Sequence, residues 1–167
     1  MWLEVLKNSA CRWGRVGLLG LAITSTACER DYSSLVRVQI CLEDKTGVES
    51  FKSVLQEFAS TQGLAYFDQS KETMESLLST GAGLAELRDP SDFLLIHAHS
   101  DQRDGITFTA SNMGLSSYEV TVEIGGTSAE EAGAFAEALN SRLAQTWPLT
   151  PIPEGAGPLP LRNCRDY

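Results

Sequence analysis

The sequence has little positive charge. Its 167 residues contain 13 lysines and arginines against 22 aspartates and glutamates, which gives a formal net charge of −9. Nucleic-acid binding needs clustered basic side chains to neutralise phosphates, and the sequence contains no such cluster. We therefore expect no nucleic-acid partner. An acidic surface is typical of a soluble protein, and it also suits a basic partner.

A run of apolar residues long enough to span a membrane is also missing near the N-terminus. The apolar stretch 16–23 is much shorter than the roughly 20 residues that a spanning helix requires. It follows Lys7, Arg12 and Arg15 and precedes the small residues of 24–27. A positive flank, a short apolar core and small residues are typical of a secretory signal. The sequence therefore predicts a signal peptide over residues 1–27.

The end of this predicted signal carries a lipidation pattern. The stretch Ser25-Thr26-Ala27-Cys28 resembles the lipobox of bacterial lipoproteins, although Ser25 stands where an aliphatic residue is typical. The resemblance implies that Cys28 is acylated and that 28–34 form a lipidated anchor and tether. The protein is then expected on the cell membrane or outer membrane, with its domain facing the periplasm or the exterior. The alternative is ordinary cleavage after Ala27, which releases a soluble periplasmic protein.

Cysteine is scarce, and the predicted processing assigns a place to each of the four cysteines. Cys11 leaves with the predicted signal, and Cys28 is used by lipid. Cys41 and Cys164 remain, an even pair in an oxidising compartment. We therefore predict a disulfide between Cys41 and Cys164.

Between the tether and the C-terminal segment, apolar residues alternate in several short stretches. Such alternation is typical of strands with one buried face. The predicted strands are 35–42, 64–67, 93–99, 106–110 and 118–124.

Other stretches carry apolar residues at the three- and four-residue spacings of amphipathic helices. One helix is predicted to begin at a capping box formed by Thr46 and Glu49 and to end at Gly63. A second begins at Ser128 and cannot continue past Pro148, and a short third helix is expected over 73–80.

These elements predict an α+β fold for residues 35–147. We expect two layers, with two main helices on one face of a mostly antiparallel sheet, in a ferredoxin-like variant. Residues 148–167 contain five of the six prolines and are predicted to form an extended tail. The expected domain organisation is thus signal, anchor and tether, one α+β domain, and the tail.

The outward positions of the strands define a candidate binding face on the side of the sheet without helices. A Cys41–Cys164 bridge would draw the tail across this face, because Cys41 also points outward. The candidate residues are Arg37, Gln39, His97, His99, Thr107, Thr109, Glu119, Thr121 and Glu123.

One group of residues on this face has metal-ligand chemistry. The stretch His97-Ala-His99-Ser-Asp101 is similar to the start of the His-x-His-x-Asp-His motif of metallo-β-lactamases. Gln102 replaces the final histidine, and the chain has no third histidine, so we do not assign it to that family. We expect no bound metal, because zinc sites ordinarily need three or four protein ligands. The alternative is a site formed by His97 and His99 with Asp101 or a glutamate of the neighbouring strand.

The sequence lacks recognisable catalytic motifs. It has no Gly-x-Ser-x-Gly nucleophile motif and no phosphate-binding loop. We therefore expect no cofactor and no enzymatic activity. The predicted function is that of a membrane-anchored envelope lipoprotein whose domain binds an envelope protein or cell-wall material. One version is an immunity-type protein that neutralises a basic toxin. The alternative is a metal-binding protein or metallohydrolase that uses His97 and His99.

Overall fold

The computed structural model describes residues 34–80, 89–100, 105–158, 161 and 164. The predicted signal peptide, the predicted acylation site Cys28 and Asp101 lie outside these residues. Within the described segments, no helix is long and apolar enough to cross a membrane.

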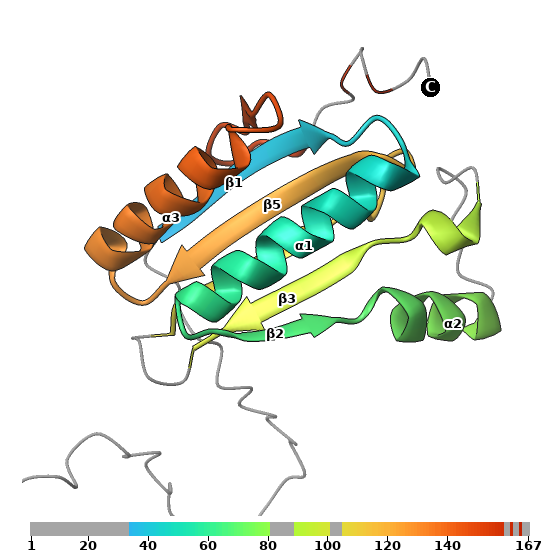
Figure 1. The fold of residues 1–167 in the computed structure, drawn as a ribbon, viewed down its shortest axis with the longest axis horizontal. Coiled ribbons are helices and arrows are strands. Elements are labelled where there is room, and N and C mark those ends of the chain that lie inside the picture. The colour runs from blue at the N-terminus through green and yellow to red at the C-terminus, as the bar shows by residue number, and fades with distance from the viewer. Residues whose placement is uncertain (1–33, 81–88, 101–104, 159–160, 162–163, 165–167) are drawn as a thin grey trace, which may run out of the picture.

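Across the described residues the fold is mixed α+β, with a six-stranded antiparallel sheet and three α-helices (Figure 1). The sheet order is β2-β3-β4-β5-β1-β6, and every pair of neighbouring strands is antiparallel. The first five strands each begin and end within two residues of the stretches that alternation predicts. Their bounds are β1 (Ser34–Cys41), β2 (Ala65–Asp68), β3 (Leu95–His99), β4 (Thr107–Ser111) and β5 (Glu119–Gly126).

The sixth strand was not predicted. β6 (Thr150–Pro151) lies in the proline-rich segment and pairs with β1 through Val38 and Gln39. A proline has no N–H to donate, so within a sheet it is confined largely to edge strands. A two-residue strand with a proline shows no alternation, which explains why sequence analysis missed it.

Two long helices cover one face of the sheet. Figure 1 shows α1 (Lys45–Thr61) and α3 (Ala129–Leu143) side by side on that face, and α2 (Ser70–Thr80) follows β2 at the edge of the sheet. A short 3-10 turn, η1 (Pro90–Asp92), precedes β3. The apolar stripes of α1 and α3 meet each other, since the Phe58 and Phe135 rings pack edge to face with centroids 5.4 Å apart.

The core lies between the two helices and the inward positions of the strands. The strand side consists of alternating residues such as Ile40, Phe108 and Val122, none of which is exposed. Burial of such side chains contributes about 1.5–3 kcal/mol each. The opposite positions of the same strands therefore form a face that neither α1 nor α3 covers.

The N-terminus of α1 differs from the sequence prediction. Asp44, not Thr46, is the N-cap, and its Oδ1 accepts a hydrogen bond from the backbone N–H of Gly47 at 2.8 Å. Gly47 is required by close packing, because a Cβ there would lie 1.9 Å from the carbonyl oxygen of Leu42. The predicted end at Gly63 is correct, since this glycine follows the helix in a left-handed conformation (φ 69°) that favours glycine.

Candidate functional site on the uncovered face of the sheet

The register of the sheet aligns the candidate residues in rows across the strands. One row consists of Phe67, His97, Thr109, Glu123 and Arg37, each opposite the next. Alternate residues of a strand point to opposite sides, so this row shares the face that α1 and α3 leave uncovered.

Two further rows lie on the same face. The first contains His99 and Thr107, and the second contains Ser111, Thr121 and Gln39. Cys41 and Glu119 pair at the next outward position along β1 and β5. The structure thus brings all nine candidate residues together on one side of the sheet.

The C-terminal segment covers one end of this face. The predicted disulfide is present, with Cys41 and Cys164 joined across 123 positions of the sequence. Both cysteines are buried, and the N–H of Cys164 donates to the carbonyl oxygen of Leu161 at 3.1 Å. Because Cys41 points away from the helices, the bridge holds Cys164 on the outward side of β1 and β5.

Glu119 is the polar centre of this covered end, and it is buried although the sequence places it on the candidate binding face. The residue is only 2% exposed. Its carboxylate accepts hydrogen bonds from Gln39 Nε2 at 2.7 Å, from Ser116 Oγ at 3.2 Å and from the backbone N–H of Leu161. A buried carboxylate needs such donors to offset the loss of water. Glu119 therefore fixes the tail and leaves no exposed group for ligand binding.

The edge of the covered end is formed by Arg37 and the segment after β6. The N–H of Ile152 donates to the carbonyl oxygen of Arg37 at 3.0 Å, and the guanidinium of Arg37 donates to the carbonyl oxygen of Pro153 at 3.4 Å. Arg37 is thus used, in part, to hold the C-terminal segment beside β1.

The opposite end of the face carries the two histidines and an aromatic residue of β2. His97 and His99 lie with their ring centroids 5.3 Å apart, and the His99 ring stacks on Phe67 at 5.4 Å with an interplanar angle of 9°. Phe67 is 44% exposed, which is unusual for so large an apolar side chain, and both histidines are half-buried. We call these three residues, with Thr107 and Thr109, the open end of the face.

Hydrogen bonds orient the polar residues of the open end. His97 Nδ1 lies 3.3 Å from Thr109 Oγ1, and Thr107 Oγ1 donates to the carbonyl oxygen of Ala98 at 3.0 Å. Burial lowers the pKa of His97 below its ordinary value of 6.5, and the positive charge that His99 can carry lowers it further. His97 is therefore held as a neutral imidazole over more of the acidic range than a free histidine.

Two remaining candidate residues lie between the two ends. Glu123 is half-buried, opposite Thr109 and Arg37. Thr121 lies opposite Ser111 and Gln39, and its hydroxyl oxygen is buried with no hydrogen-bond partner among the described residues.

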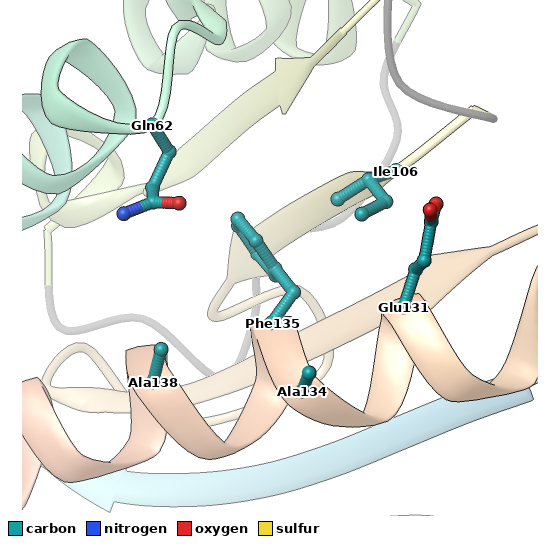
Figure 2. Close-up of a pocket in the computed structure, with 6 residues that line it drawn as sticks. All are labelled: Gln62, Ile106, Glu131, Ala134, Phe135 and Ala138. Carbon is teal, nitrogen blue, oxygen red and sulfur yellow. The ribbon is translucent and has the colours of Figure 1, made fainter.

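The helix side of the molecule has a shallow cavity of about 340 Å³ between the end of α1 and α3 (Figure 2). Figure 2 shows Phe135 between Gln62 and Ile106, with Glu131 at one end and the small side chains of α3 below. Glu131 is the one ionisable residue of its lining. This cavity therefore offers little chemistry beyond apolar contact.

A second cavity, of about 480 Å³, lies near α2. Its two basic lining residues, Lys52 and Lys71, contact carboxylates at 2.9 Å (Asp68) and 3.9 Å (Glu75). The charges of this cavity are thus directed at the protein's own groups.

Sequence analysis missed Phe67 as a residue of the candidate face. Its stretch was correctly predicted as a strand, but an apolar residue in a strand is ordinarily assigned to the core. Phe67 lies opposite His97 in the register of β2 and β3, so it points to the same uncovered face as His97 and His99. The sequence did contain a signal, namely the alternation within the strand. It places Ala65 and Phe67 on one side of β2 and Tyr66 on the other side.

The described residues contain no group of three or more histidine, cysteine, aspartate or glutamate side chains placed to hold a metal ion. Asp101, the third ligand of the alternative site, lies outside them. No family model matches the sequence, and no curated protein matches it.

Proposed function

We propose that the chain is an exported, lipid-anchored envelope protein whose domain binds a partner through the open end of the uncovered face. The observation that carries the proposal is the combination of the exposed Phe67 with two oriented, half-buried histidines on the sheet face that α1 and α3 leave uncovered. Exposed aromatic side chains are enriched at binding surfaces, where they contribute large contact areas. We expect the partner to be an envelope protein or cell-wall material.

The disulfide supports the proposed address of the domain. Disulfides form and persist in oxidising compartments such as the bacterial periplasm and the cell surface. The Cys41–Cys164 bridge fits a domain that is exported behind the Cys28 anchor. The non-enzymatic character of the domain is part of the same proposal, with a metallohydrolase that uses His97 and His99 as the alternative.

We also propose that the fold is a variant of the ferredoxin-like arrangement. The strand order supports it, because α1 connects β1 to β2 and α3 connects β5 to β6. Each connection joins two strands of the same direction that are separated by other strands, and the two connections overlap. The meander β3-β4-β5 is the departure from the simplest form of this plan.

Site-specific photocrosslinking in cells tests the binding surface. A photoreactive residue at Phe67 is expected to form a specific adduct with the partner, whereas one at Gln56, exposed on α1, is not. Equal adducts from both positions, or none from Phe67 in the native envelope, would contradict the proposal.

Fractionation of cells tests the anchor separately. The chain is expected in the detergent phase with acyl mass on an N-terminal Cys28, and Cys28→Ala is expected in the soluble fraction. An unmodified Cys28 in the mature protein would overturn lipidation without affecting the binding surface.

A further inference from the structure

We propose that His97 and His99 form an exchangeable site for a divalent transition-metal ion, held by two imidazole nitrogens and completed by water. This inference rests on the proposed use of the open end as a binding surface, and it names a class of ligand. It revises the sequence-based expectation that the histidine pair holds no metal.

The separation of the two rings fits a shared ion. A zinc–nitrogen bond of about 2.0–2.1 Å, added to about 1.2 Å from ring centre to nitrogen, places each ring centre about 3.2 Å from the metal. Two such rings at a tetrahedral angle have centres about 5.3 Å apart. The centroids of His97 and His99 are 5.3 Å apart. The spacing of the two ring centres therefore fits a shared ion.

Thr109 supplies the support that metal-binding histidines ordinarily have. Such a histidine donates its second ring N–H to an oxygen, which sets the tautomer and the direction of the ring. Thr109 Oγ1 lies 3.3 Å from His97 Nδ1 and can accept that N–H. With the proton on Nδ1, the lone pair of His97 is on Nε2, the nitrogen left for a ligand.

The orientation of His99 is compatible with the same arrangement. Its Nδ1 atom is buried, so coordination by His99 uses Nε2. The stack on Phe67 limits rotation of the ring. Both imidazoles are thus restrained before an ion arrives, which reduces the conformational entropy lost on binding.

Two protein ligands predict a weak, exchangeable site. Resident zinc sites have three or four protein ligands, and the described residues provide no such group. Imidazole suits copper, nickel and zinc, and Cu²⁺ binds most tightly among the divalent first-row ions. The tetrahedral spacing of the rings suits Zn²⁺, whereas Cu²⁺ has the higher intrinsic affinity for imidazole. On affinity alone we expect Cu²⁺ to bind more tightly than Ni²⁺ or Zn²⁺, with water in the remaining positions.

Titration of the full chain with Cu²⁺ and Ni²⁺ tests the site. The chain is prepared without a polyhistidine tag. It carries the substitutions Cys11→Ala and Cys28→Ala, so that these two thiols do not compete for the metal. Calorimetry is expected to give one site, and electron paramagnetic resonance of the Cu²⁺ form is expected to show two nitrogen donors. His97→Ala and His99→Ala are each expected to weaken binding more than tenfold while the unfolding midpoint without metal stays close to that of the parent.

Two threonine variants separate a supported site from adventitious binding. Thr109→Val removes the oxygen opposite His97 and is expected to weaken binding by about tenfold. Thr121→Val is the matched control, since it lies on the same face but opposite neither histidine. Three outcomes would overturn the inference. The two threonine variants could weaken binding equally, the two-nitrogen spectrum could survive the loss of either histidine, or no binding could be detected at millimolar metal.

The metal site and the binding surface fail separately. If the photocrosslinker at Phe67 captures its partner but no metal binds, the metal inference alone is wrong. If metal binds as described but Phe67 captures nothing, the partner proposal is wrong and the site remains.

Discussion

The two ends of the uncovered face contain similar polar residues in different states. At the covered end, Gln39 and Glu119 are buried under the C-terminal segment and bond to each other and to the tail. At the open end, His97 and His99 are half-buried beside the exposed Phe67. The strands are equally regular in both places. The difference therefore comes from what lies over them, and a polar residue on a strand has a structural role wherever another segment covers it.

Removal of the disulfide is expected to have the largest effect on this comparison. For a closed loop of this length the chain-entropy model gives about 4–5 kcal/mol of stabilisation, and natural bridges typically contribute 2–5 kcal/mol. Cys41→Ser and Cys164→Ser should each lower the free energy of unfolding by this amount, as measured in urea. The double variant is the control, because it should cost no more than either single change. Unchanged stability in all three would mean that the bridge does not hold the tail.

The second expected effect distinguishes the two glutamates of β5. Glu119→Gln should lower the free energy of unfolding by about 1–3 kcal/mol. The new amide has one oxygen and one NH₂ group, and its NH₂ group would face N–H donors that now bond to the carboxylate inside a buried site. Glu123→Gln is the matched change on the same strand and face, and it should stay within about 0.5 kcal/mol of the parent. Urea denaturation of both variants is the measurement. Equal losses would contradict the division of the face into two ends.

The smallest expected effect concerns the open end and depends on pH. Because burial lowers the pKa of His97 in the folded state, the unfolded chain takes up this proton more readily. The contribution of His97 to stability is fully present above pH 6.5 and is lost as the pH falls through 6.5 toward the folded pKa. His97→Asn should therefore lose less stability than the parent between pH 7.5 and 5. The measurement is thermal unfolding of both proteins across this pH range, without metal. Parallel curves of melting temperature against pH would contradict the prediction.

Much of the fold was predictable because it depends on local patterns. The alternation in β1 and β5 and the helical spacing in α1 and α3 placed these elements within a few residues of their bounds. The same alternation placed His97, Thr109 and Glu123 on one face, since each strand has only two sides. Errors arose where a competing local contact existed. Asp44 caps α1 in place of Thr46, because its carboxylate accepts the hydrogen bond from the N–H of Gly47.

The candidate site was less predictable, because its residues differ in burial rather than in type. No local pattern indicates that the N–H of Leu161 reaches Glu119, 42 residues away in the sequence. Phe67 looks like a core residue until its register opposite His97 is known. Neighbouring strands decide which outward residues stand side by side, and the sequence alone does not provide the register.

The sequence by itself determined the types of the main elements, the polar face of the sheet and the pairing of the two cysteines left after the predicted processing. Composition, alternation and residue chemistry are local properties, so they are visible without coordinates. The tertiary structure alone decided which residues of that face are open. Strand order, register and the path of the C-terminal segment depend on contacts between distant parts of the chain. These contacts buried Glu119 beneath the tail and left His97 and His99 beside an exposed aromatic ring.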